Sequence, residues 1–403
     1  MQTISDLDLP LLPLEDPALS EDPAWYFNEA RQHHPWLAKC SFGYVMTQYD
    51  AVREFMRHED KMRMSHHDMV RMMGASGTPW GDFVENSIQA QSGEEHKRLR
   101  DTLKTAFTPR MANTYRPIIR ETISDLLDEW VPKAAIDFEE FASYFPITVM
   151  CRILGASPDA IPSVRASLET LGLGASMDAG HLPDFQDATN TMQAFVRDLV
   201  AQRRAEGRTE VVDLLDKLLE TRDQGGLTDD ELYNLLIFLH VAGYDTSKNL
   251  LTLVMFTLLD QPEVYERCAA DIAYCRKAIN EVLRYYGFAS LPRVIDKEFE
   301  FQDVKFPEGT MVLLPWGILG RDPSAFENAD EFDPERTDGG KHVAFGLGGH
   351  ICLGQFLARA QTEEGLYQIA QRMRNPKLAG EFEWRSFTGV WGVRGLPIEF
   401  EPA

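Results

Sequence analysis

The alternation of hydrophobic and polar positions changes along the chain and predicts where helices and strands lie. Residues 36–49 alternate apolar and polar side chains around a glycine, a pattern typical of two short strands joined by a turn. From about 50 to 290 the hydrophobic positions follow the helical period, interrupted by glycines and prolines. Strand patterns return at 298–303, at 310–315 and in the tail at 387–400. The chain is therefore predicted to be mainly α-helical with minor β structure.

No internal repeat, low-complexity tract or Ser/Gly-rich linker divides the 403 residues. We therefore expect a single domain over residues 1–403, with a helix-rich lobe and a smaller β-rich lobe. Because strand patterns occur near both ends of the chain, the termini are expected to meet in the β-rich lobe.

Composition and charge narrow the class of protein. Hydrophobic residues make up 44% and charged residues 26%, which is typical of a globular protein. The formal net charge of −23 disfavours nucleic acid and anionic membranes as partners. The first 25 residues carry acidic side chains among prolines, and no apolar stretch is long enough to cross a bilayer. We therefore expect a cytoplasmic protein with no membrane attachment.

The five cysteines are odd in number and form no Cys-x-x-Cys pair, so neither a disulfide framework nor a zinc ribbon is predicted. Cys352 follows a glycine-rich loop and precedes an amphipathic helix that starts at Gln355. A helix N-terminus favours the thiolate, the metal-binding form of cysteine, and the glycines are expected to donate N–H groups to the sulfur. An inert buried cysteine and a nucleotide-binding loop fit less well, since Ile351 stands where a dinucleotide fingerprint has its third glycine.

A second segment with candidate chemistry is the apolar run 230–260, which is expected to form a helix buried in the core. Asp245 and Thr246 interrupt this run at some energetic cost. The residues alone leave two interpretations open. Either the pair is functional, or Thr246 bonds back to the carbonyl of Ala242 while Asp245 finds a salt bridge.

Residues 345–354 (FGLGGHICLG) resemble the signature Phe-Gly-x-Gly-x-His-x-Cys-x-Gly of the cytochrome P450 family, the haem-thiolate monooxygenases. Residues 243–246 (GYDT) are similar to the family's Gly-x-Asp/Glu-Thr motif. The resemblance covers nearly the whole chain and implies the cytochrome P450 fold, with haem b between the two lobes. It implies that Cys352 is the thiolate ligand of the iron and that Phe345 and Gly354 contact the cofactor.

The resemblance also assigns roles on the buried helix. Thr246 would hydrogen-bond bound dioxygen, and Asp245 would deliver protons through water. Helical spacing places three further residues on the face of Thr246, where they would line the oxygen side of the haem: Phe238, Val241 and Ala242. His240 points elsewhere by the same geometry and is expected to be a packed or hydrogen-bonded core residue.

The haem propionates need Arg, His or other donors at the edge of the pocket. Four residues match the family positions for this role: His96, Arg100, Arg293 and His350. The sequence departs from many relatives just before His96, where residues 92–95 (SGEE) replace Asp-Pro-Pro-x.

Three charged residues are expected to be structural rather than catalytic. Glu281 and Arg284 are spaced i, i+3, which by itself is often a surface pair of little worth. They match the family's Glu-x-x-Arg motif, which in relatives joins a downstream arginine, here Arg336, in a buried triad.

By family position, the substrate pocket would be bordered by segments that carry almost no charge, so we expect a small to medium hydrophobic substrate. These segments are residues 70–92, the turn Gly172–Gly180, the stretch from Ala289 to Leu291, and the tail near Val390. Glycines in the turn fit a mobile hinge or an ordinary loop. Six methionines between Met56 and Met73 offer adaptable apolar surface, although methionines are more often core filler.

A basic cluster lies between residues 96 and 120 of this acidic chain. It could be a docking patch for an acidic electron-transfer protein or an ordinary solvated helix face. The chain has no flavin or iron–sulfur motif, so the resemblance implies electrons from a separate ferredoxin-type partner and its reductase. The expected function is O2-dependent hydroxylation. The alternatives are a peroxygenase of the same fold, which Asp245 and Thr246 disfavour, and a haem-based sensor or binding protein.

Overall fold

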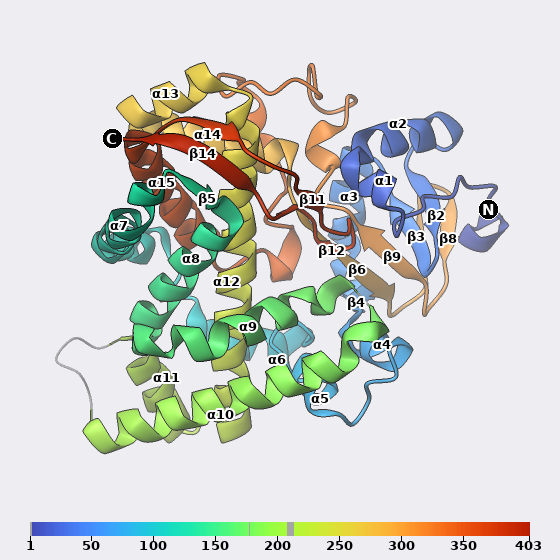
Figure 1. The fold of residues 1–403 in the computed structure, drawn as a ribbon. Helices are drawn as coiled ribbons and strands as arrows, with labels where there is room; N and C mark the ends of the chain where they lie inside the picture. The colour runs from blue at the N-terminus through green and yellow to red at the C-terminus, as the bar shows by residue number, and fades with distance from the viewer. Residues whose placement is uncertain (1, 177, 208–212) are drawn as a thin grey trace. The chain divides into compact units, whose positions relative to one another are not determined.

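The computed structural model describes residues 2–176, 178–207 and 213–403, which Figure 1 shows as a ribbon. These residues form two compact units, each assembled from segments far apart in the sequence. The β-rich unit comprises Met1–Ser65, Arg276–Cys352 and Glu383–Arg394. The helix-rich unit comprises His66–Cys275, Leu353–Phe382 and Gly395–Ala403. The predicted division into a helix-rich and a smaller β-rich part is confirmed, while the expectation of one domain over the whole chain stays a prediction.

The main sheet of the β-rich unit has six strands. Its strands run in the order β12 (Gly389–Val390), β6 (Ala289–Ile295), β9 (Met311–Leu314), β3 (Gly43–Met46) and β2 (Leu37–Cys40), and β4 (Met62–Met64) pairs with β6. β2 and β3 form the predicted antiparallel hairpin, and β3 pairs parallel with β9. The strand β6 is therefore central, with three strands hydrogen-bonded to it.

Two smaller sheets and several short helices complete the β-rich unit. The sheets are β1 (Gln2–Thr3), β8 (Val304–Phe306) and β7 (Phe299–Phe301), and β11 (Glu383–Trp384) with β13 (Val393–Arg394). The helices are α1 (Pro17–Glu21), α2 (Pro23–His33), α3 (Tyr49–Phe55), the larger part of α14 (Ile272–Tyr285), and the 3-10 turns η1 (Ile4–Asp6), η2 (Met56–Lys61), η7 (Leu319–Arg321), η8 (Gly339–Lys341) and η9 (Gly348–His350). Several aromatic rings pack together in its core, where Phe55 contacts both Phe301 and Phe306.

The helix-rich unit consists of long helices and one small sheet. Its helices are α4 (His66–Met72), α5 (Pro79–Glu85), α6 (Gly93–Leu103), α7 (Pro109–Trp130), α8 (Phe138–Leu154), α9 (Ile161–Gly172), α10 (Leu182–Glu206), α11 (Leu214–Asp223), α12 (Asp229–Leu259), α13 (Pro262–Ala270) and α15 (Gln355–Arg372), with 3-10 turns η3 (Val131–Lys133), η4 (Pro158–Ala160), η5 (Leu173–Ser176) and η6 (Ala179–His181). Its sheet has the order β10 (Met373–Leu378), β14 (Pro397–Pro402), β5 (Ala135–Asp137). None of the helices described is long and apolar enough to cross a bilayer.

The helix α12 is the long apolar helix that the sequence predicts, and it packs against α8 and α9 (Figure 1). A capping box fixes its start: Thr228 accepts from the Glu231 N–H, and the Glu231 carboxylate accepts from the Thr228 N–H. A Cβ atom at Gly243 would lie 2.8 Å from the sulfur of Met150. Glycine at this position therefore permits the close approach of α12 to α8.

The predicted structural triad is confirmed in the β-rich unit. The Glu281 carboxylate accepts from Arg284 Nη2 at 2.7 Å and from Arg336 Nε at 2.9 Å. Glu281 and Arg284 are each 1% exposed. The remaining donors of Arg284 bind three backbone carbonyls, those of Gly320, Ala329 and Glu331. The triad thus ties α14 to the loop that precedes the cysteine motif.

The expectation that both termini meet in the β-rich lobe is wrong. Strand β1 pairs with β8 in the β-rich unit, whereas β14 pairs with β5 and β10 in the helix-rich unit. The reason lies just after β13, where Gly395 takes a φ of +63°. The Asp137 carboxylate then accepts the N–H of Leu396 at 3.0 Å, and Glu139 accepts the N–H of Gly395 at 2.8 Å. These bonds direct the last residues toward the start of α8.

Candidate active site

The glycine-rich loop before Cys352 closes on itself in the β-rich unit. Gly346 N–H donates to the Val343 carbonyl at 2.8 Å, and Cys352 N–H donates to the Phe345 carbonyl at 2.9 Å. Gly346 and Gly348 have φ values of +74° and +76°, in the left-handed region that glycine adopts without strain. The loop therefore presents Cys352 in a fixed backbone conformation.

Cys352 is the cysteine best suited to bind a metal. It is partly exposed, while the other four cysteines are buried. Burial raises the pKa of the Cys40 thiol to about 11 and that of Cys151 to about 12, which keeps both protonated and inert at neutral pH. The helix α15 begins three residues after Cys352, with Gly354 as its N-cap. The predicted position of the cysteine, just ahead of a helix N-terminus, is confirmed.

Two glycines of the loop, Gly346 and Gly349, donate their N–H groups to oxygen acceptors instead of the expected cysteine sulfur. The N–H of Gly346 is bound by Val343, and the N–H of Gly349 lies 2.8 Å from a carboxylate oxygen of Glu59. Their donors are directed at oxygen acceptors because the turn closes with its own carbonyls and with a side chain from η2.

Three residues predicted to border the substrate pocket lie together on the β-rich unit. Ala289 and Leu291 share one face of β6, and Val390 of β12 pairs with Ala289. All three side chains are half-buried, while Ser290 and Pro292 between them are buried. This face of the sheet is apolar and partly open.

Arg293 lies on the same face of β6, two residues beyond Leu291, and is only 4% exposed. Burial lowers the pKa of its guanidinium to about 10, and the negative charge of Glu59 opposes that shift. Among the residues that the structure describes, Arg293 forms no ion pair, and its one hydrogen bond is a long 3.5 Å contact to the Pro292 carbonyl. A buried cation that forms no ion pair with the described residues suits an anionic cofactor group, so this residue fits a haem propionate.

The helix α12 carries one open stripe in the helix-rich unit. Between Leu235 and Met255 most of its side chains are buried, and the four that are partly exposed lie at helical spacing: Phe238, Val241, Ala242 and Thr246. These are the residues that the sequence places on one face. The stripe is apolar except for the Thr246 hydroxyl, which fits the surface of a flat hydrophobic cofactor or its substrate.

Thr246 and Asp245 both make the local contacts that were the alternative to a functional role: a bond back to the Ala242 carbonyl and a salt bridge. The Thr246 hydroxyl donates to the Ala242 carbonyl at 2.7 Å, and Asp245, 3% exposed, lies 3.7 Å from Lys248 Nζ. Lys248 also donates to Glu139 at 2.9 Å, so a buried carboxylate–ammonium–carboxylate chain runs from α12 to the start of α8. Lys248 and Glu139 were missed in the sequence, although a lysine within a buried apolar helix is a signal for such a pair.

Each unit holds two of the four residues predicted to bind propionates. In the helix-rich unit, His96 is buried and Arg100 half-buried, four residues apart on α6. In the β-rich unit, Arg293 lies on β6 and His350 ends the turn η9. The helix α6 starts at Gly93 although the proline-containing sequence of many relatives is absent.

The expected basic cluster is largely ion-paired. Arg98 contacts Glu95 and Glu231, and Lys104 contacts Asp101. Arg116 and Arg120 bind Glu364 and tie α7 to α15. These contacts favour an ordinary helix face and interhelical packing for most of the cluster, and only Lys97 and Arg110 add exposed positive charge outside the ion pairs described.

One of the segments expected to close the pocket, residues 70–92, is anchored through Trp80. The ring of Trp80 on α5 stacks on Phe185 of α10 at a centroid distance of 5.0 Å. The backbone N–H of Trp80 donates to the side-chain oxygen of Gln186 at 2.9 Å. The turn Gly172–Gly180 holds η5 and the start of η6, while residue 177 lies outside the described residues. Of the six methionines, only Met72 is exposed, so core filling accounts for the other five: Met56, Met62, Met64, Met69 and Met73.

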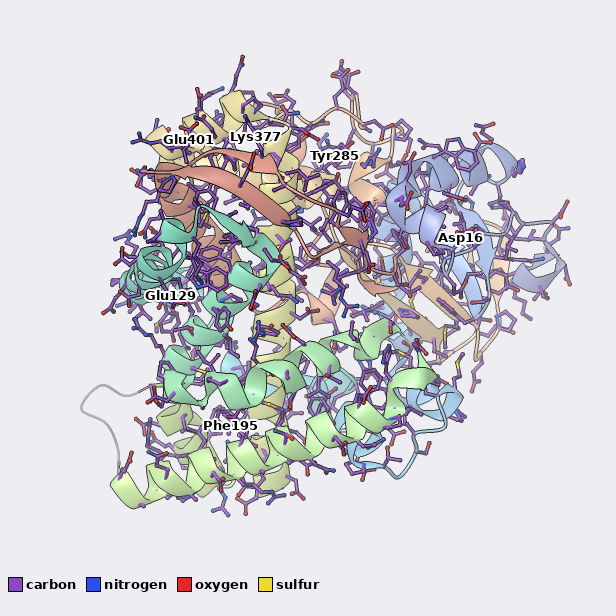
Figure 2. All side chains as sticks on the ribbon, in the orientation of Figure 1. Asp16, Glu129, Phe195, Tyr285, Lys377 and Glu401 are labelled. Atoms are coloured by element: carbon purple, nitrogen blue, oxygen red, sulfur yellow. The ribbon has the colours of Figure 1, made fainter. Side chains whose placement is uncertain are left out.

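His240 is the core histidine that the sequence predicts. It is fully buried in α12, its Nδ1–H donates to the Leu236 carbonyl at 2.7 Å, and the ring of Phe195 packs against it nearly at a right angle. Phe195 lies on α10, where Figure 2 labels it. Its Nε2 has no hydrogen-bond partner among the described residues. Burial lowers the pKa of His240 to about 4.

This shift predicts a loss of stability in mild acid. Because the folded-state pKa lies below the unfolded value of about 6.5, the unfolded chain takes up the proton first as pH falls. The contribution of His240 to the free energy of unfolding is constant above pH ~6.5 and declines as the pH falls toward ~4. The decline amounts to about 2 kcal/mol between neutrality and pH ~5. Denaturant titrations of wild type and His240→Leu across this range check it, since parallel pH profiles would contradict a buried neutral His240.

Comparison with known proteins agrees with this geometry. The sequence profile described as Cytochrome P450 matches residues 175–375. The luteothin monooxygenase of Streptomyces thioluteus is 32% identical, with 98% of this chain and 97% of the relative covered. The biotin biosynthesis cytochrome P450 of Bacillus subtilis (strain 168) is 29% identical, with 94% and 97% covered.

Solved structures give the same result for the fold. The cytochrome P450 BioI, in complex with acyl carrier protein ligated to hexadec-9Z-enoic acid, has a TM-score of 0.85 and 26% identity, with 95% of this chain and 100% of that chain covered. The enzyme CxnD, described as forming a C–S bond in chuangxinmycin biosynthesis, has a TM-score of 0.86 and 25% identity, with 98% and 99% covered. The chain described here therefore belongs to the cytochrome P450 family.

Proposed function

We propose that this cytochrome P450 monooxygenase uses O2 and electrons from a separate ferredoxin-type protein and its reductase to hydroxylate a small to medium hydrophobic substrate. The observation that carries the proposal is the loop that holds Cys352 partly exposed just ahead of α15, while every other cysteine is buried. Haem b, when bound through this thiolate, supplies the activation of oxygen.

Different residues are proposed to bind the iron and the propionates of the cofactor. Cys352 provides the thiolate, and Phe345 and Gly354 flank it in the motif. The buried guanidinium of Arg293 and the side chains of His96, Arg100 and His350 are proposed to bind the propionates. Charge-assisted bonds to the carboxylates would orient the macrocycle, and the buried position of Arg293 would keep water away from one of them.

Proton delivery is proposed for Asp245 and Thr246. Thr246 lies on the open stripe of α12, and its hydroxyl can donate there when it leaves the Ala242 carbonyl. Asp245 lies one residue away, buried 3.7 Å from Lys248 Nζ, where its carboxylate could accept a proton from water and pass it on. The pair argues against a peroxygenase, which needs no proton relay to an O2-derived oxygen.

The substrate class follows from the open apolar side chains. Ala289, Leu291 and Val390 on the β-rich unit, and Phe238, Val241 and Ala242 on α12, offer no charge to a ligand. The names of the relatives point to luteothin, to biotin biosynthesis and to a fatty acyl group on a carrier protein. For this chain we propose a hydrophobic small molecule as the substrate and the cytoplasm as the place of the reaction.

Thr246→Ala tests the proposed proton delivery. The variant is expected to bind substrate normally but to lose roughly tenfold or more of product per electron consumed, because a positioned proton donor is missing. The electrons should appear as hydrogen peroxide. The measurement is product and peroxide per NADPH with a surrogate ferredoxin and reductase, using the terpenoid, aromatic, fatty-acid or steroid compound that gives the largest shift in haem absorption.

Thr257→Ala is the matched control, since Thr257 also lies on α12 and donates to the carbonyl four residues back at 2.7 Å. It should leave coupling unchanged. Normal coupling in Thr246→Ala would contradict the relay. Absence of product from the wild type with every reductase system, despite bound haem, would favour a sensor or binding protein.

A further inference from the structure

The carboxylate of Glu59, far from Cys352 in the sequence, hydrogen-bonds to the backbone of the cysteine loop. Glu59, in the turn η2 of the β-rich unit, places its two oxygens 2.8 Å and 3.1 Å from the Gly349 N–H. A hydrogen bond to an ionised acceptor is stronger than one between neutral groups. The contact joins residues 290 positions apart in the sequence. Gly349 itself lies three residues before Cys352.

The loop is shaped to receive this carboxylate. Gly348 has a φ of +76°, and any Cβ atom at this position would overlap the Glu59 side chain. The left-handed backbone accounts for glycine at position 348, and the absence of a Cβ atom leaves the space that the carboxylate occupies. The turn η9 (Gly348–His350) closes through a bond from Ile351 N–H to the Gly348 carbonyl at 3.2 Å, and Glu59 holds it in addition from a distant segment.

The same carboxylate acts on the buried cation of the unit. Its negative charge opposes the effect of burial on the pKa of Arg293 and so favours the protonated guanidinium. Glu59 thus influences both the loop that carries the thiolate and the residue proposed to bind a propionate.

We propose that Glu59 is a positioning residue that fixes the cysteine loop and lowers the reduction potential of the haem. The proposal rests on the proposed haem-thiolate function. Its physical content is twofold: the hydrogen bond restrains the turn η9, and the charge near the cofactor disfavours addition of an electron.

Two substitutions separate the bond from the charge. Glu59→Gln removes the charge but retains an oxygen that accepts from Gly349, whereas Glu59→Ala removes both. Asp60→Asn is the matched control, because it deletes an equal charge from the adjacent residue, whose exposed side chain pairs with Lys61 at 3.0 Å. All three are compared with wild type as haem-loaded full-length proteins.

Hydrogen exchange reports on the contact itself. The Gly349 amide should exchange about tenfold faster in Glu59→Ala, by less in Glu59→Gln, and at the wild-type rate in Asp60→Asn. The haem reduction potential, measured by spectroelectrochemistry, should rise in both Glu59 variants and much less in the control. Glu59→Ala should also convert most readily to the form whose reduced CO complex lacks the red-shifted thiolate band.

The outcomes are distinct from those of the proposed function. Wild-type exchange at Gly349 together with an unchanged potential in both Glu59 variants would overturn the inference, even if wild type shows the thiolate spectrum. A wild type that shows no thiolate spectrum would instead overturn the proposed function, and the exchange of Gly349 would still test whether Glu59 holds the loop.

Discussion

Replacing Cys352 with alanine is expected to abolish the red-shifted absorption of the reduced CO complex, which only a thiolate opposite CO produces. The reason is that no other described cysteine can take its place: the other four are buried, and Cys40 and Cys151 have pKa values near 11 and 12. Haem content should fall as well, because the remaining contacts are hydrogen bonds and apolar packing. Absorption spectra of the reduced protein with and without CO give the result.

Cys40→Ala is the matched control. It removes a thiol from the β-rich unit at a buried position on β2 and should leave the thiolate band unchanged. A Cys352→Ala protein with the wild-type band would refute the ligand assignment. So would a wild-type protein that stays colourless after expression with ample haem, or one whose iron is held by nitrogen.

The parts of the site that could be predicted from sequence are those encoded locally. Glycines at 346 and 348 adopt the left-handed backbone that the motif requires, and α15 starts where the periodic pattern begins. The open stripe of α12 follows from helical spacing alone, because side chains three and four residues apart share a face. The triad around Glu281 was predictable only through the family resemblance, since its i, i+3 pair looks like many surface pairs.

The contacts that could not be predicted join distant segments. Glu59 reaches Gly349 across 290 positions, and nothing in the local pattern of residues 56–61 distinguishes this carboxylate from Asp60 beside it. Strand β4 lies within a stretch with helical periodicity and becomes a strand only by pairing with β6. In both cases the partner, rather than the local sequence, decides the conformation.

The tail shows the same limit. Its strand pattern is correct, but the pattern does not say which sheet each strand joins. Carboxylates at Asp137 and Glu139 accept the N–H groups of Leu396 and Gly395 and thereby assign β14 to the helix-rich unit. Such side-chain acceptors for backbone donors leave no periodic signal, so the division of the tail after β13 follows from the structure alone.

Replacing Glu281 with glutamine is expected to destabilise the protein by about 3–5 kcal/mol, the second large effect. Glu281 is 1% exposed, and the substitution leaves Arg284, also 1% exposed, as a buried cation without its carboxylate. The amide keeps one acceptor oxygen but replaces the other with a donor NH2 group, and both oxygens now accept from Arg284, at 2.7 and 2.9 Å. Desolvation makes an unpaired buried charge far more costly than a broken surface pair. Urea titrations that compare the free energy of unfolding measure the difference.

Glu335→Gln provides the control for that experiment. Glu335 pairs with Lys277 at 2.5 Å in the same unit, but the two side chains are 44% and 54% exposed, so solvent already screens them. Breaking this pair should change the free energy of unfolding by less than about 1 kcal/mol. If Glu281→Gln and Glu335→Gln unfold at the same denaturant concentration, the triad contributes no more than a surface ion pair. In that case the three backbone carbonyls around Arg284 would be sufficient to hold its charge.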